Sequence, residues 1–181
     1  MDRVGADFER CVEMMISKLG AKPVPVLIPW GSAETFRGVI DVLDAKAYDF
    51  RDEVLGAEFE VVDVPAEHKA EFDAWREKAI EAIAETDDDL MHKYLEGEIP
   101  SVDELKAALR KATITGRLHP VVCGSAFKNK GVQQLLDAVV AFLPSPLEIP
   151  PIKGVDEDGK ETLRETKDDA PFAALVFKIM T

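Results

Sequence analysis

The sequence predicts an α/β fold in which the C-terminal part of one α/β domain carries an inserted α+β module. A helical pattern over residues 7–19 and a strand–loop–helix unit over 118–143 flank a stretch, 21–117, that is first β-rich and then helix-rich. A short apolar run, typical of a buried parallel strand, opens the later unit. Because one parallel strand cannot form a sheet, we expect other strands of this domain to precede the sequence.

The first helix is expected over 7–19. Its apolar residues recur with helical spacing on one face: Phe8, Cys11, Val12, Met15, Ile16 and Leu19. Asp7 can accept a hydrogen bond from the first turn of this helix, and Gly20 can adopt the left-handed conformation that ends it.

Four strands are expected in the β-rich stretch. Pro23–Trp30 has prolines at alternate positions, which suits an edge strand because proline has no backbone N–H to donate. The other three are Phe36–Leu43, Lys46–Phe50 and Phe59–Val64. Gly38 predicts a bulge or close packing.

Three helices are expected after these strands, the first over 66–85. One face of that helix is apolar and comprises Phe72, Trp75, Ala79, Ile80 and Ile83. The run Asp87–Asp89 ends it and can cap a short second helix. Ser101 and Glu104 form a capping box at the start of the third helix, which Gly116 ends.

The later α/β unit continues from its short strand into the polar loop Ser125–Gly131 and a helix over 132–143. The apolar face of this helix comprises Val132, Leu135, Leu136, Val139 and Leu143. Prolines then favour a stiff linker over 144–169, in which Asp156–Gly159 is a charged turn. A last strand is expected within 170–181.

Composition limits the function. The 181 residues carry a formal net charge of −13, which disfavours duplex DNA or an anionic membrane as the main partner. The sequence has no apolar run long enough to span a bilayer and no secretory signal, so we expect no membrane partner. Cys11 and Cys123 lack metal-type spacing and are predicted to be buried thiols in a reducing, cytoplasmic compartment.

Six segments follow one another along the chain: Met1–Phe8, Tyr94–Glu98, Cys123–Gln133, Leu143–Pro146, Pro151–Gly154 and Ala170–Met180. Together they resemble bacterial elongation factor G, a family of translational GTPases. The segments stand in the family's order and cover nearly the whole chain, which makes the resemblance specific.

The resemblance implies a P-loop GTPase domain interrupted by an inserted subdomain. Residues 1–20 and 118–143 would belong to the GTP-binding domain, 21–117 to the inserted α+β subdomain, and 144–169 to a linker. Residues 170–181 would begin a second, β-barrel domain. The intact protein would bind GTP or GDP with Mg²⁺ and hydrolyse GTP to move tRNA and mRNA through the ribosome.

The resemblance also implies a guanine site. Asp2 matches the carboxylate of the guanine-recognition motif, and an ionised carboxylate can accept two parallel hydrogen bonds from the base. The segment Ser125, Ala126 and Phe127 matches the second base-binding loop, in which the amide at the alanine position donates to the guanine O6 atom. Adenine offers the opposite donor pattern and would be rejected.

The chain lacks the glycine-rich loop Gly-x-x-x-x-Gly-Lys-Ser/Thr that holds phosphates, and the resemblance places the switch motifs and the catalytic histidine upstream. Phosphoryl transfer depends on those parts, so we expect this chain alone to be inactive and to bind no nucleotide tightly. The three histidines, His68, His92 and His119, show no ligand spacing, so no metal site and no catalytic residue is expected.

Five glutamates form an acidic stripe within an arc of about 120° on the predicted helix over 66–85. They are Glu67, Glu71, Glu77, Glu81 and Glu85. The stripe suits either an ordinary solvated face or a docking site for a basic partner. The resemblance implies that this partner is the ribosomal stalk protein.

Two alternatives to an elongation factor G segment stay open. A ribosome-protection or release-factor relative would share this architecture, although Lys128–Lys130, Leu143–Pro146 and Pro151–Gly154 favour elongation factor G. A free-standing, non-enzymatic module that binds the stalk protein would explain the missing phosphate loop. It would leave the apolar faces of the helices over 7–19 and 131–143 uncovered.

Overall fold

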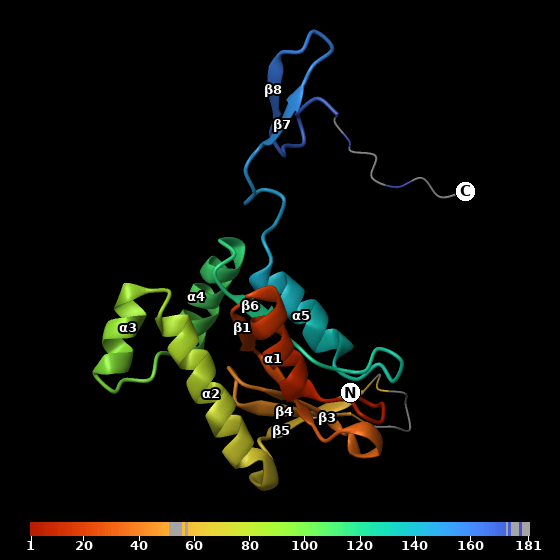
Figure 1. The fold of residues 1–181 in the computed structure, drawn as a ribbon, viewed down its shortest axis with the longest axis vertical. Helices are drawn as coiled ribbons and strands as arrows, with labels where there is room; N and C mark the ends of the chain where they lie inside the picture. The colour runs from red at the N-terminus through yellow and green to blue at the C-terminus, as the bar shows by residue number, and fades with distance from the viewer. Residues whose placement is uncertain (51–55, 57, 173, 175–177, 179–181) are drawn as a thin grey trace. The chain divides into compact units, whose positions relative to one another are not determined.

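The computed structural model describes residues 1–50, 56, 58–172, 174 and 178, and these form a mixed α/β fold with parallel and antiparallel strand pairs (Figure 1). The helices are α1 (Phe8–Leu19), α2 (Lys69–Ala84), α3 (Asp88–Leu95), α4 (Val102–Ile114) and α5 (Val132–Phe142), with the 3₁₀ turns η1 (Ala33–Thr35) and η3 (Ala66–His68). The strands are β1 (Pro23–Pro25), β2 (Leu27–Trp30), β3 (Gly38–Asp41), β4 (Lys46–Phe50), β5 (Phe59–Asp63), β6 (His119–Val121), β7 (Ile152–Val155) and β8 (Glu161–Arg164). The chain divides into two units, 1–143 and 144–181.

The larger unit contains an antiparallel sheet in the order β2-β3-β4-β5 and a separate parallel pair, β1 and β6. The prediction of a parallel strand near residue 120 is therefore confirmed. Its predicted burial is wrong, because His119 is exposed and the other β6 residues are half-buried. In the described part of the chain β6 pairs with β1 alone, which leaves its other edge without a strand.

The expected strand over 23–30 is two strands. The break falls at Val26, whose N–H donates to Val121 O (2.8 Å), whereas its carbonyl accepts from Val42 N (3.0 Å). The chain thus changes partner at this residue, from β6 to the end of β3. The edge position predicted from the prolines is confirmed for β2, which is the first strand of its sheet.

The helix ends follow the predicted capping chemistry. Asp7 accepts from Arg10 N (2.9 Å) at the start of α1, and Gly20 ends this helix with φ of +63°. Ser101 and Glu104 form the reciprocal capping box of α4. The helix expected over 66–85 is shorter at its start, because η3 precedes it; a 3₁₀ turn is common at a helix N-terminus.

The core of the larger unit lies between the antiparallel sheet, the β1–β6 pair and helices α2 to α4. Its buried side chains come from strands β1 to β4, from helices α2 to α5 and from the residue before β6, and include Val24, Ile28, Ile40, Ala47, Phe72, Ile83, Leu90, Leu105, Leu109, Leu118 and Phe142. The core therefore continues across the expected boundaries at residues 21 and 117. Trp75, predicted to face the core, is only half-buried and meets Phe8 edge-on at 5.9 Å.

Two helices expose apolar faces, as the sequence predicts. Ile16 and Leu19 of α1 are 54% and 76% exposed, and Leu136 and Val140 of α5 are 60% and 81% exposed. The prediction of two buried thiols is half wrong. Cys123 is half-buried, and burial of its thiol raises its pKa to about 12, but Cys11 is exposed.

The smaller unit contains an antiparallel hairpin of β7 and β8 in the segment expected to be a linker. Asp156 organises the predicted charged turn, since its side chain accepts from the N–H groups of Asp158 and Lys160. The strand expected within 170–181 lies mostly outside the described residues.

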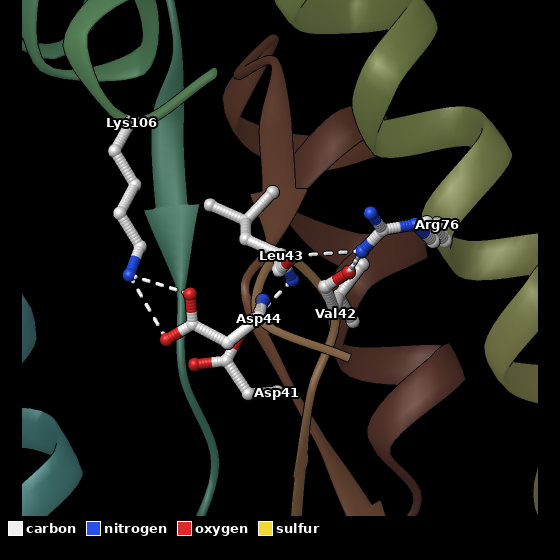
Figure 2. A network of polar contacts seen from close by, with 6 residues as sticks. All are labelled: Asp41, Val42, Leu43, Asp44, Arg76 and Lys106. Carbon is white, nitrogen blue, oxygen red and sulfur yellow. Dashed lines mark hydrogen bonds and ion pairs between the residues drawn. The ribbon is translucent and has the colours of Figure 1, made fainter. Parts of the chain in front are cut away.

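A polar network holds the turn between β3 and β4 (Figure 2). Asp41 Oδ1 accepts from Leu43 N (2.9 Å) and Asp44 N (2.7 Å). Lys106 of α4 pairs with Asp44, and Arg76 of α2 donates to the carbonyls of Val42 and Leu43. The turn is thereby fixed to two helices at once.

Burial raises the pKa of Asp41 to about 6, and the neighbouring Asp44 charge contributes. Ionisation of Asp41 therefore costs more in the folded than in the unfolded chain, so stability falls as pH rises from about 4 through 6. We predict that Asp41→Asn keeps both turn hydrogen bonds and stabilises the chain by about 2 kcal/mol near pH 8. The gain should disappear near pH 4, which urea unfolding at both pH values would measure. An equal gain at both pH values would contradict the assigned cause.

Candidate functional site

The loop after β6 is a tight turn between two hydrogen-bonded residues. Ser125 and Lys130 exchange both backbone hydrogen bonds, with N–O distances of 2.9 and 3.0 Å. Within the turn Asn129 N donates to Ala126 O (3.2 Å), and Lys128 N donates to Ser125 Oγ (3.2 Å). A Cβ atom on Gly124 would lie 2.6 Å from Lys130 O, so only glycine permits this closure.

Lys130 anchors the loop from inside. Its side chain is 1% exposed, and Nζ donates to Phe36 O at 3.1 Å. A lysine is rarely buried so fully unless it is paired. This contact joins the loop to the segment before β3, so the loop is held in place by the core.

The N-terminal segment lies against this loop. The Met1 nitrogen donates to Gly124 O at 2.7 Å, and Met1 O accepts from Ala33 N at 3.0 Å. A hydrogen bond from the Ser125 side chain is the main cause that lowers the pKa of Asp2, with smaller contributions from the Met1 and Lys128 charges. The lowered pKa favours the ionised, acceptor-only form of Asp2.

The turn offers hydrogen-bond donors at the same place. Ala126 and Phe127 are exposed, the latter 93%, and the Ala126 N–H has no acceptor among the described residues. A carboxylate beside a free backbone N–H can bind a planar ring that presents two adjacent donors and one acceptor. The structure thus brings Asp2 and Ser125 together across 123 positions of the chain, with Ala126 and Phe127 next in the turn.

The acidic stripe lies elsewhere. All five glutamates are exposed, but Glu67 stands on η3 and Glu85 is the C-terminal cap of α2, so only Glu71, Glu77 and Glu81 share that helix. Glu71 also contacts His68 Nδ1 at 3.3 Å. The stripe therefore spans a 3₁₀ turn and a helix, and the arc of about 120° applies to the helix alone.

Sequence reasoning gave no site role to Lys130, and no pattern marks it, because a lysine between Asn129 and Gly131 is typical of a solvated turn. Among the described residues no group of three His, Cys, Asp or Glu side chains could hold a metal ion. None of the described helices has both the length and the apolar character to cross a membrane.

Comparison with known proteins gives two findings. A family model described as the elongation factor Tu GTP binding domain matches residues 1–145. The crystal structure of ttk003000868 from Thermus thermophilus is similar, with a TM-score of 0.70 and 34% sequence identity over 83% of this chain. The match covers 23% of that protein, so the chain spans about a quarter of its length.

Proposed function

The chain belongs to the elongation factor Tu GTP-binding domain family, and we propose that it is a segment of elongation factor G, the GTPase that drives ribosomal translocation. The family consists of GTP-binding translation factors, which act on the ribosome. The observation that carries the proposal is the contact of Met1 and Asp2 with the Gly124–Ser125 loop. Their roles come from the resemblance of both segments to the guanine site of that factor.

In this proposal Asp2 accepts hydrogen bonds from the guanine N1–H and 2-amino groups. The Ala126 N–H donates to O6, and the exposed Phe127 side chain lies next to it in the same turn. Ser125 favours the ionised form of Asp2 by lowering its pKa, while Lys130 fixes the loop from the core. A rigid donor–acceptor pair of this kind discriminates guanine from adenine, because adenine would leave both protein groups unpaired.

In the same proposal each remaining segment of the chain belongs to a domain of elongation factor G. Residues 1–20 and 118–143 belong to the GTP-binding domain, 21–117 to an inserted subdomain, 144–169 to the connection, and 170–181 to the start of a β-barrel domain. The groups that hold the phosphates and Mg²⁺ belong to other parts of the intact protein, which supply the phosphoryl-transfer chemistry. This chain would contribute recognition of the base and contacts with the ribosome.

The proposal is tested with the complete protein encoded by the gene that contains this sequence. Added with GTP to ribosomes that hold a peptidyl-tRNA ready to move, it should advance the mRNA by one codon, as measured by primer-extension toe-printing. A protein that instead releases a ribosome-bound inhibitor or a release factor, without mRNA movement, would favour the alternative relatives. Stalk binding with no GTP requirement and no movement would favour the free-standing module.

We also propose that the acidic stripe docks the ribosomal stalk protein. All five side chains are exposed, and the opposite face of α2 is committed to the core through Phe72, Ala79 and Ile83. Charge reversal of Glu77, Glu81 and Glu85 to lysine should weaken stalk binding in a pull-down by at least about fivefold, since it replaces attraction by repulsion.

The matched control reverses three exposed acidic residues of the hairpin, Glu157, Asp158 and Glu161, with the same change in net charge. This control should bind the stalk protein like the unmodified chain. If both triple variants lost stalk binding equally, net charge alone would explain the effect. Unchanged binding of the α2 variant would contradict the proposal that the stripe docks the stalk protein.

A further inference from the structure

A cavity of about 220 Å³ opens beside the turn between β3 and β4, away from the guanine loop residues. It is bounded by β2, this turn, β4, α4 and α5. Apolar walls come from Val26, Leu27, Leu43, Ala138, Ala141 and Phe142, and polar groups from Asp41, Asp44, Tyr48, Lys106, Gln134 and Asp137. Polar and apolar groups thus face one another across a space large enough for a small organic molecule.

Gln134 is the first indication of a ligand. Its side chain is 5% exposed, it lines the cavity, and its Oε1 atom has no hydrogen-bond partner among the described residues. A buried acceptor without a donor costs free energy, so native proteins usually satisfy it. A donor that enters from the cavity would satisfy this atom.

The charged side chains that line the cavity also favour a ligand that donates hydrogen bonds. Lys106 Nζ lies 2.7 and 2.9 Å from the two Asp44 oxygens, so this pair is neutral as a whole (Figure 2). Asp41 and Asp137 have no described cation within ion-pair distance. The two turn hydrogen bonds of Asp41 both use Oδ1, which leaves Oδ2 as an acceptor.

The pKa of Tyr48 also shows that the cavity lining is negatively charged. Burial and the charges of Asp41, Asp44 and Asp137 raise its pKa to about 12. Its hydroxyl therefore stays protonated, and the lining presents an excess of acceptors and negative charge over donors. Such a lining favours a cation that carries several N–H donors.

We propose that this cavity binds a small organic cation, in which an ammonium or guanidinium group meets Asp41, Gln134 Oε1 and Asp137 while a short carbon chain lies on Leu27, Ala138 and Phe142. The apolar walls favour such a ligand over a hydrated metal ion. The described residues also lack a group of three His, Cys, Asp or Glu side chains for a metal. The site is independent of the guanine loop, so its test does not depend on the proposed function.

The test uses the purified 181-residue chain and n-butylammonium, with n-butanol as an uncharged probe of similar shape. Two-dimensional NMR should show saturable shifts of the backbone amides of 41–48 and 134–141 with n-butylammonium and none with n-butanol. Asp137→Asn, at the exposed rim, should weaken binding by about tenfold. Gln134→Leu should abolish binding without lowering the unfolding midpoint, because it removes an unsatisfied buried group. Asp103→Asn, on the exposed side of α4, is the matched control and should bind normally.

Equal shifts with n-butanol, or none with n-butylammonium, would overturn the proposal. A response to Na⁺ or Mg²⁺ at the same amides, in place of the organic cation, would also overturn it. A purely structural role of Gln134 predicts that Gln134→Leu lowers the unfolding midpoint while Asp137→Asn binds normally, and this result would contradict the site.

Discussion

Replacement of Asp2 by asparagine in the complete protein should transfer its nucleotide preference from GTP to xanthosine triphosphate. Guanine presents N–H donors to Asp2, whereas xanthine carries an oxygen at C2, which the asparagine amide can meet as a donor. The rate of GTP hydrolysis on ribosomes should fall by about 100-fold at limiting GTP, because the asparagine amide N–H would face the guanine 2-amino group, donor against donor. The rate with xanthosine triphosphate should rise correspondingly.

Asp7→Asn is the matched control for this change. Asp7 lies five positions after Asp2, and its replacement by asparagine removes the same charge. Asp7 caps α1 through a side-chain oxygen that asparagine also has. The control should keep its preference for GTP. Loss of activity with both nucleotides in Asp2→Asn would show that Asp2 has a structural role and does not read the base.

Gly38→Ala should be among the most destabilising single-methyl additions in the chain. A Cβ atom at Gly38 would lie 1.9 Å from Tyr48 O and 3.0 Å from Tyr48 C, both backbone atoms of the neighbouring strand. Backbone cannot move aside without breaking the β3–β4 register, so we expect a loss of at least about 3 kcal/mol. Urea or thermal unfolding of the 181-residue chain would measure it.

Gly154→Ala provides the matched control, since Gly154 is also a strand glycine and its Cβ would meet only Thr162 Cγ2 at 4.0 Å. This variant should be within about 0.5 kcal/mol of the unmodified chain. A Gly38→Ala variant as stable as the Gly154→Ala variant would mean that the close approach of β3 and β4 is absent in solution.

Features set by local chemistry could be predicted from the sequence. The cap of α1 at Asp7, its end at Gly20 and the capping box of Ser101 and Glu104 depend on residues within one helical turn. The close packing expected at Gly38 is also confirmed, and the neighbour is the backbone of Tyr48. Each of these follows from the conformational freedom or hydrogen-bonding capacity of one or two side chains.

Features set by distant contacts could not be predicted. Val26 divides the expected strand because its backbone forms hydrogen bonds with Val121 and Val42, which are far from it in the sequence. The β7–β8 hairpin was missed because its strands are short, charged and exposed, and carry no apolar alternation. The cavity at Asp41 and Gln134 joins a turn and a helix more than ninety positions apart.

The candidate site also contains features that local sequence predicts and features that depend on distant contacts. No periodicity relates Asp2 to Ser125, so only the resemblance to a known family could pair them, and in the structure the Ser125 side chain lowers the pKa of Asp2. Lys130 was missed because its burial depends on the carbonyl of Phe36, which no local pattern reveals. The acidic stripe could be located from helical spacing, although the 3₁₀ turn at Glu67 could not.

The most direct test of the account is a crystal structure of the complete protein with GDP bound. We predict that both Asp2 carboxylate oxygens lie within hydrogen-bond distance of guanine N1 and the 2-amino group, and that the Ala126 N–H donates to O6. A base bound away from Asp2 and the Ser125–Phe127 turn would contradict the central claim that these residues read guanine.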